Sequence, residues 1–290
     1  MARESWGRWG AEDEIGAPNL IGAEQVRLAA SLVRTGQVVS LAQPISDRMP
    51  VPAHRAGVMH FMGRDGGDYA AGAKRPGGFQ FAEDTVVLPL HIGTHIDALC
   101  HAWCDDHLYN GFPASTVRST TGALRCGIEK MKPLVTRGVL LDIVRLRGRL
   151  AAPGDAIGRA ELEAAAARTG ITPRTGDAVL IRTGWQESQT SRDVDFNAEP
   201  GIDVDAALWL ASCEVSMVGA DNFAIEALPF PPGTVFPVHQ RLIRDYGIPF
   251  LEGMVLRPLA ETGGTAFLFV ATPLPVVGGT GSPIAPVAVL

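Results

Sequence analysis

The sequence predicts an α/β fold in which a mixed, partly parallel sheet carries helices on its faces. From residue 138 onward, short runs of apolar, β-branched residues alternate with Ala-rich segments of helical character, which is the pattern of βαβ units. The 33 glycines and 21 prolines exceed average usage, so we expect many turns and irregular loops rather than a helical bundle. At 290 residues, with 46% apolar and 19% charged residues, the chain has the length and composition of one folded domain over residues 1–290.

Each expected element rests on local signals. The first helix is expected at 23–35, where apolar side chains recur at helical spacing before Gly36. A strand at 38–41 is followed by a Gly- and Pro-rich loop at 46–80, a length that is usually functional or mobile. The other expected strands cover residues 85–92, 138–144, 178–183, 215–221, 250–256 and 265–271. The other expected helices cover residues 159–169, 204–213 and 237–246, and a glycine follows the first and the last of them.

Charge and hydropathy exclude several function classes. The net charge is −6 and no run of Lys or Arg exceeds two residues, which argues against a nucleic-acid partner. The uncharged stretch after Glu261 is interrupted by prolines and glycines, so it predicts buried sheet and turns rather than a membrane span. The N-terminal residues lack the apolar core of a secretory signal, and four cysteines do not make a disulfide scaffold. We therefore expect a cytoplasmic protein with reduced thiols.

Histidines are concentrated in one short segment. Four of the seven lie within 17 residues, and the centre of the cluster reads HIGTHIDALCH, with His91, His95, Asp97 and His101. On an extended segment, positions 91, 95 and 97 project from the same face, and the β-branched residues between them favour extension. Gly93 can provide a bulge. Two imidazoles and a carboxylate suit Zn²⁺, Mn²⁺ or Fe²⁺, so this segment predicts a metal site.

The same segment resembles the H-x-G-T-H-x-D-x-x-x-H signature of the cyclase family of metal-dependent hydrolases, which includes bacterial kynurenine formamidases and isatin hydrolase. The resemblance extends over nearly the whole chain. It includes the segments SWGRWGAEDEIGAPNLI, HFMGRDGGD, GADNFAIE, FPVHQRLIRDYGIPFLE and GGTGSPIAPVAV. It implies the swivelling β/β/α fold of that family and a homodimer or homotetramer.

The resemblance also implies roles for individual residues. His91, His95 and Asp97 would be metal ligands, and His239 and Glu252 would be distal ligands to one or two Zn²⁺ or Mn²⁺ ions, with Asp97 bridging two. His101 matches the catalytic histidine, which acts first as general base and then as general acid. Ala98, Leu99 and Cys100 precede it where the formamidases usually carry a proline. The resemblance therefore indicates the family and leaves the substrate open.

The residue chemistry is consistent with hydrolysis. Cleavage of a carbonyl at neutral pH needs a water of lowered pKa, an electrophile for the oxyanion and a proton acceptor, which a metal and a histidine supply. We expect cleavage of a carbon–nitrogen bond other than a peptide bond, or of a related ester, in a small amide, formamide, lactam or lactone. The alternatives are cyclase- or lactonase-type acyl chemistry in secondary metabolism, a non-haem Fe(II) oxygenase and a metal-binding protein without turnover. The oxygenase would leave His101, His239 and Glu252 without roles.

Three further residues are candidates for contact with a small, possibly aromatic substrate. His60 lies in the expected long loop, Trp103 could form an apolar wall, and Ser282 lies in a GTGSP turn that could orient a carbonyl. Each has a structural alternative. His60 could anchor its loop, Trp103 could be a core or dimer contact, and Ser282 could belong to a turn without a binding role. Trp6 and Trp9 lie in an N-terminal segment that is too short to bury itself, which favours association with another copy of the chain.

Overall fold

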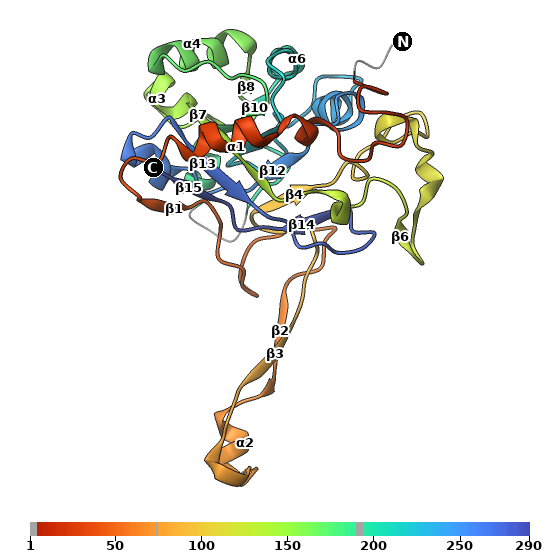
Figure 1. Ribbon diagram of the computed structural model, residues 1–290, viewed down its shortest axis with the longest axis vertical. Helices are drawn as coiled ribbons and strands as arrows, with labels where there is room; N and C mark the ends of the chain where they lie inside the picture. The colour runs from red at the N-terminus through yellow and green to blue at the C-terminus, as the bar shows by residue number, and fades with distance from the viewer. Residues whose placement is uncertain (1–4, 74, 190–193) are drawn as a thin grey trace.

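The structure is a computed structural model that describes residues 5–73, 75–189 and 194–290. Its centre is a sheet of nine described strands in the order β1-β15-β13-β7-β9-β11-β12-β4-β14. Figure 1 shows this sheet with helices packed on it and one long hairpin that projects away from the body. In chain order the strands are β1 (Val38–Ser40), β4 (His95–Asp97), β7 (Leu134–Asp142), β9 (Ala178–Arg182), β11 (Met217–Ala220), β12 (Phe250–Glu252), β13 (Ala266–Ala271), β14 (Gly281–Pro283) and β15 (Val287–Val289).

The predicted mixed, partly parallel sheet is confirmed. Strands β7, β9, β11 and β12 pair in parallel, whereas β4, β14, β13, β15 and β1 join antiparallel. The parallel strands β9 and β11 are buried over almost their whole length, which is why their sequences read as continuous apolar runs. Short paired strands flank the sheet: β8 (Ala156–Ile157) with β10 (Gly201–Ile202), and β5 (Val117–Arg118) with β6 (Gly122–Ala123).

The helices follow the predicted positions where local signals are strong. Helix α4 (Arg159–Thr169) ends at Gly170 in the left-handed conformation, and α6 (Val204–Ser212) begins at Asp203, whose carboxylate accepts the Ala206 N–H. The other helices are α1 (Ala23–Ala30), α2 (Gly66–Ala70), α3 (Ile143–Arg147), α5 (Trp185–Ser188), α7 (Pro237–His239) and α8 (Arg257–Thr262). A π-helical segment, η6 (Gln240–Asp245), continues α7, and the 3₁₀ turns are η1 (Ala17–Leu20), η2 (Pro76–Gly78), η3 (Tyr109–Gly111), η4 (Ala114–Thr116) and η5 (Ile128–Lys130).

Two predicted boundaries are wrong for identifiable reasons. The first helix ends at Ala30 instead of residue 35, because the N–H groups of Thr35 and Gly36 donate to the Leu290 carbonyl at the far end of the chain. The strand expected over 250–256 ends at Glu252, because Gly253 takes φ 60° and turns the backbone. A Cβ at Gly253 would collide with the Gly93 carbonyl, so this turn needs glycine.

The expected loop at 46–80 instead contains a strand and a helix. Strand β2 (Met59–Arg64) pairs antiparallel with β3 (Glu83–Val87), and α2 lies between them at the tip of the projecting hairpin (Figure 1). The strand expected over 85–92 therefore ends at Val87 and belongs to the hairpin. The exposed residues of β2 and β3 lack the alternation of a half-buried strand, so the sequence pattern did not indicate β2.

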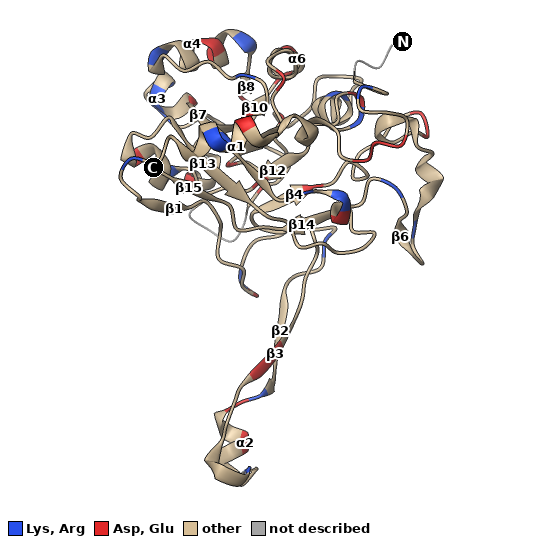
Figure 2. Ribbon diagram, viewed as in Figure 1, with Lys and Arg blue, Asp and Glu red and all other residues tan. Residues whose placement is uncertain are grey.

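Charged and aromatic residues at the surface bear on the other predictions. Along the ribbon of Figure 2, positions of Lys and Arg are interspersed with positions of Asp and Glu. No helix in the described ranges is long and apolar enough to cross a membrane.

Trp6 packs on its own chain: its indole N–H donates to the Arg244 carbonyl over 2.8 Å and its ring lies under the Arg244 guanidinium. Trp6 is thereby half-buried against its own chain.

Candidate metal centre

Strand β4 brings the centre together because it lies between β12 and β14. In the antiparallel register, His95 pairs with Glu252 on β12, and Asp97 pairs with Gly281 on β14. Directly opposed residues in an antiparallel pair have side chains on the same face of the sheet. The register therefore places the Glu252 carboxylate beside the His95 imidazole, although the two residues are distant in sequence.

His91 reaches the centre by a different route from the predicted one. It precedes β4 in a bent segment, and Gly93 has φ 54°, so a shared strand face explains His95 and Asp97 and does not explain His91. The turn brings His91 back so that its Nδ1 lies 2.7 Å from Asp97 Oδ1, while its Nε2 lies 3.0 Å from the Thr280 hydroxyl. The prediction of one extended segment for all three residues is wrong, but their convergence is confirmed.

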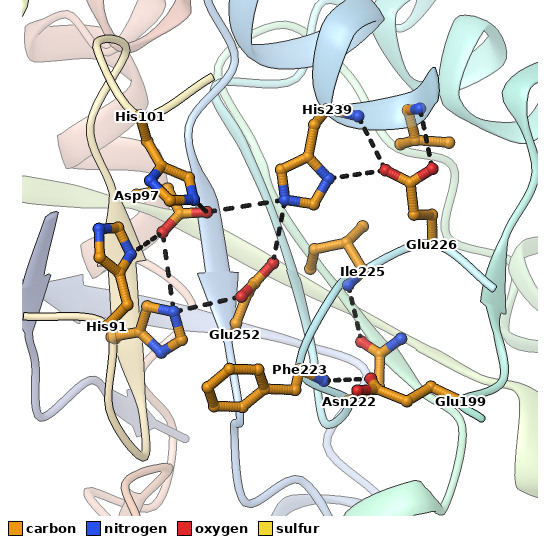
Figure 3. Close-up of polar contacts among 12 residues, drawn as sticks. His91, Asp97, His101, Glu199, Asn222, Phe223, Ile225, Glu226, His239 and Glu252 are labelled. Carbon is orange, nitrogen blue, oxygen red and sulfur yellow. Dashed lines mark hydrogen bonds and ion pairs between the residues drawn. The ribbon is translucent and has the colours of Figure 1, made fainter. Parts of the chain in front are cut away.

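The side chains of the centre converge from separate segments of the chain (Figure 3). His95 Nε2 lies 3.2 Å from Glu252 Oε2 and 3.7 Å from Asp97 Oδ1, so these three buried groups can share one cation. His91, Asp97 and His101 form a second possible group, in which His101 Nε2 lies 3.9 Å from Asp97 Oδ2. His239 Nε2 lies between the two groups, 4.0 Å from Asp97 Oδ2 and 3.6 Å from Glu252 Oε1.

Three atoms at this point have unsatisfied bonding capacity. Among the described residues, His95 Nε2, Asp97 Oδ2 and Glu252 Oε1 are buried side-chain atoms without a hydrogen-bond partner. Buried polar atoms normally have a partner, because leaving them unpaired costs free energy. An imidazole nitrogen and two carboxylate oxygens are ligands of a divalent cation, so the residues present fit a metal ion.

Neighbouring groups orient the two deeply buried imidazoles. His95 Nδ1 lies 3.0 Å from the Gly93 carbonyl oxygen, which can only accept, so Nδ1 carries the proton and Nε2 presents its lone pair to the centre. His239 Nδ1 donates to Glu226 Oε1 over 2.6 Å, and Glu226 also accepts the N–H groups of Val238 and His239. Such second partners fix the ring orientation of metal-binding histidines. Sequence reasoning did not assign a role to Glu226, although it ends the GADNFAIE segment.

The pKa values of His101 and His239 are shifted in opposite directions. Burial is the largest influence on His101 and lowers its pKa to about 4, so its imidazole is neutral at pH 7 and can accept a proton. Burial alone would lower the pKa of His239 as well, but the hydrogen bond to Glu226 and the nearby Glu252 carboxylate outweigh it and raise the pKa to about 10. Burial would raise the pKa of Asp97, yet the facing imidazoles of His101 and His91 hold it well below its usual range. Asp97 therefore stays a carboxylate.

A cavity of about 670 Å³ opens beside the centre. His101, His239 and Glu252 line one part of it, and loop residues 51–55 line another. Its apolar wall is formed mainly by aromatic rings, those of Phe196, Phe223, Phe230 and Phe236. A volume of this size holds a small molecule, and aromatic walls with a few polar groups are typical of ligand sites.

Comparison with known proteins assigns the family. A family model described as "Putative cyclase" matches residues 39–227, which is more than half of the chain. The chain belongs to the cyclase family. A crystal structure described as a novel cyclase is 38% identical, with 99% of this chain and 97% of that chain covered and a TM-score of 0.91.

More distant structures share the fold of this cyclase-family protein. A protein from Bacillus stearothermophilus described as a predicted metal-dependent hydrolase is 21% identical, with 87% of this chain and 97% of that chain covered and a TM-score of 0.57. An isatin hydrolase bound to the product analogue thioisatinate is 22% identical, with 93% and 99% covered and a TM-score of 0.65. No protein in the curated set matched the chain.

The three substrate candidates of this cyclase-family protein lie away from the cavity. His60 is exposed on β2, where its Nε2 lies 2.6 Å from Asp84 Oδ2. Trp103 is 45% exposed, and Ser282 is buried on β14, where its hydroxyl donates to the Pro283 carbonyl and accepts the Leu274 N–H. None of the three is among the described residues that line the cavity, and their contact with a substrate stays a prediction.

Sequence reasoning missed several residues that do line the cavity of this cyclase-family protein. Glu199 is 1% exposed and accepts the Phe223 N–H over 2.6 Å, which holds the loop that carries Phe223. Arg55 also lines the cavity and donates to the His91 carbonyl over 2.6 Å. Neither residue lies in a spacing pattern, because their positions depend on how distant loops pack. The aromatic character of the wall was predicted, but from Trp103 rather than from the phenylalanines.

Glu199 allows a prediction about stability. Burial is the largest influence on this carboxyl and raises its pKa from 4.5 to about 8. The folded state therefore favours the protonated form of Glu199. The contribution of this protonation to the free energy of unfolding is fully present below about pH 4.5 and is lost as the pH rises to about 8. Between pH 5 and 8 we expect the wild-type free energy of unfolding to fall by about 3–5 kcal/mol relative to Glu199→Gln.

Urea unfolding of both proteins with EDTA at several pH values measures this difference without a contribution from metal binding. The exposed Glu24→Gln is the control, and its curve should follow the wild type. If the Glu199→Gln curve also runs parallel to the wild type, the pKa of Glu199 is not raised by folding.

Proposed function

We propose that this protein is a metal-dependent hydrolase of a small amide, formamide, lactam or lactone. One observation carries the proposal: three buried groups, each with an atom that has no partner among the described residues, lie close together beside a cavity that Glu252 and the neutral His101 line. The distant structures described as a metal-dependent hydrolase and an isatin hydrolase support the same reaction class. The substrate is a small molecule, and the bond that is cleaved is a carbon–nitrogen bond other than a peptide bond, or a related ester bond.

Five residues would hold one or two divalent cations, Zn²⁺ or Mn²⁺. His95, Asp97 and Glu252 form the fully buried group, and His91 and His239 flank it from either side (Figure 3). A cation bound there lowers the pKa of a water and polarises a carbonyl oxygen. The donor set of nitrogen and oxygen atoms suits either ion. Asp97 belongs to both groups of candidate ligands, so it is the residue that would bridge two ions.

His101 carries the proton transfer. Its side chain is 28% exposed and lines the cavity, so a substrate can approach its ring, unlike the fully buried ring of His95. Its lowered pKa keeps Nε2 free to accept a proton from the attacking water. The imidazolium then donates this proton to the leaving nitrogen or oxygen of the cleaved bond. The facing Asp97 carboxylate, 3.9 Å away, stabilises the imidazolium while it exists.

The cavity limits the substrate to a small molecule with an apolar, flat part. The rings of Phe196 and Phe223 meet edge to face with centroids 4.9 Å apart, and Phe230 and Phe236 meet in the same way at 4.6 Å. Their faces offer stacking surfaces for a planar aromatic group. Closure of these side chains around a ligand excludes water from the proton transfer at His101.

Metal analysis together with a substrate screen tests the proposed function. The purified protein should contain stoichiometric Zn²⁺ or Mn²⁺ and hydrolyse at least one compound among aryl formamides, isatin-like lactams and aryl lactones, with activity lost in chelator and restored by metal. Oxygen consumption without hydrolysis would assign an oxygenase instead. Metal binding without turnover of any compound, in either the hydrolytic or the ring-closing direction, would contradict an acyl hydrolase.

The projecting hairpin supports a second proposal, that the chain forms homo-oligomers through β2 and β3. Phe61 and Met62 on β2 and Val86 and Val87 on β3 are each 47–56% exposed, and most of the hairpin carries no charge (Figure 2). An isolated two-stranded hairpin with exposed apolar side chains is marginally stable in water, and a second copy of the chain would cover it.

Light scattering at micromolar concentration should give at least twice the chain mass of 30.7 kDa. Phe61→Glu should shift the protein toward the monomer, because it places a charge in the contact. Val277→Glu is the matched control, since Val277 is 83% exposed and lies outside the hairpin. A wild-type mass of about 31 kDa, or equal behaviour of the two variants, would refute this proposal.

A further inference from the structure

Arg55 lies in the wall of the cavity, next to the metal centre. Its Nη1 donates to the His91 carbonyl over 2.6 Å, and its guanidinium carbon lies 5.0 Å from the centre of the Phe223 ring. The residue is half-buried and comes from the loop before β2. One N–H of the guanidinium thus holds the side chain in place, while its other N–H donors have no hydrogen-bond partner among the described residues and can bind a ligand.

Arg55 lacks the carboxylate partner that most of the other partly buried arginines have in the described part of the chain. Among the described residues, no carboxylate oxygen lies within 4 Å of its guanidinium nitrogens. By contrast, Arg137, Arg147, Arg182 and Arg244 each pair with a carboxylate at 2.6–2.9 Å. Burial is the largest influence on Arg55 and lowers its pKa, and the charges of Glu252 and Asp97 only partly offset this.

Metal binding would leave the positive charge of Arg55 with even less negative charge nearby to offset it. The two carboxylates whose charge it feels, Glu252 and Asp97, are donors of the metal centre, so a cation bound there would neutralise them. Glu199 also lines the cavity, but its pKa of about 8 keeps it largely protonated at neutral pH. Asp195 is exposed at the cavity and is not within ion-pair distance of Arg55. A partly desolvated cation without a counter-charge is costly, unless a ligand brings an anion.

We propose that Arg55 binds a carboxylate on the substrate, separate from the carbonyl that is cleaved. The planar guanidinium donates two parallel N–H bonds to a carboxylate, and charge-assisted bonds of this kind are strong and specific. The phenylalanine rings of the cavity wall would contact an aromatic group of the same ligand. The ligands that we propose are therefore small aromatic carboxylates. The substrate assignment rests on the proposed hydrolase function, whereas the binding of an aromatic carboxylate by Arg55 does not.

Calorimetry with the metal-loaded protein tests the binding directly. The probes are benzene-1,3- and benzene-1,4-dicarboxylate, each compared with its mono-amide, which keeps the shape and loses one charge. One carboxylate can bind at the metal centre and the other at Arg55. We expect the better diacid to bind about tenfold or more tightly than its mono-amide. Arg55→Met should abolish this preference, and Arg55→Lys should retain part of it.

Arg48→Met is the matched control, because Arg48 is an exposed arginine of the same loop and does not line the cavity. This variant should keep the full preference for the diacid. Equal binding of diacid and mono-amide to the wild type, or an unchanged preference in Arg55→Met, would overturn the proposal. Melting curves confirm that each variant is folded before binding is measured.

A kinetic comparison separates this role from one at the reacting carbonyl. The substrates are the N-formyl derivatives of 2-, 3- and 4-aminobenzoate, compared with formanilide, which lacks the carboxylate. Arg55→Met should raise KM for the acidic substrate that the wild type prefers by a larger factor than it raises KM for formanilide. An equal fall of kcat for both would place Arg55 at the oxyanion and overturn the proposal. If no compound is hydrolysed but the diacid preference depends on Arg55, the hydrolase function fails and the carboxylate site stands.

Discussion

Replacing His101 by alanine should leave the metal bound and reduce kcat by roughly 10²–10⁴-fold. This is the usual contribution of a positioned general acid–base. The side chain lines the cavity, and burial lowers its pKa to about 4, so the residue can accept a proton without being a ligand. The melting temperature and the metal content should remain those of the wild type, because the orphaned donor atoms of the centre belong to other residues.

The His101 experiment also decides between two roles that geometry alone permits. His101 Nε2 lies 3.9 Å from Asp97 Oδ2, within the range of a shared cation. Loss of metal together with activity in His101→Ala would make His101 a ligand and refute its assignment as a base. His107→Ala is the control, because His107 is exposed and bonds only to a nearby backbone carbonyl through its ring.

Asp97→Asn should abolish metal binding, and with it activity. Asp97 belongs to both groups of candidate ligands, its carboxylate is fully buried, and Oδ2 has no other partner. A neutral amide is a poor ligand for a divalent cation, and ligand groups must be deprotonated to bind. Metal analysis and the rise in melting temperature on adding Zn²⁺ measure the effect. In the wild type, metal at 100 times its Kd should raise the free energy of unfolding by about 2.7 kcal/mol.

Two further variants make the Asp97 experiment specific. Glu252→Gln changes only the His95 group, so it should lower metal stoichiometry or affinity and, if two ions bind, leave one of them. Glu199→Gln makes the same chemical change at another buried, cavity-lining carboxyl and should keep full metal content. Full metal content in Asp97→Asn would exclude a centre built on Asp97. Unchanged metal content and rate in Glu252→Gln would confine the site to His91, His95 and Asp97.

Local sequence signals determined the central part of the fold. The apolar runs at 178–183 and 215–221 correspond to β9 and β11, and the Ala-rich segment ended by Gly170 is α4. These elements are buried or capped by residues within their own segments, so periodicity and turn chemistry suffice to locate them. The ligand motif was equally local: two imidazoles and a carboxylate within seven residues predicted a metal centre, and the structure brings them together.

Tertiary structure decided what local patterns do not encode. Glu252 and His95 meet because β4 pairs with β12, a register that depends on the whole sheet. Strand β2 forms because β3 pairs with it, and its exposed residues carry no periodic signal. Glu226 and Arg55 lie in loops that contact the centre through a carboxylate–imidazole pair and a backbone carbonyl. Such contacts are fixed by the packing of distant segments, so the sequence determined the chemistry of the centre and the fold determined which other residues reach it.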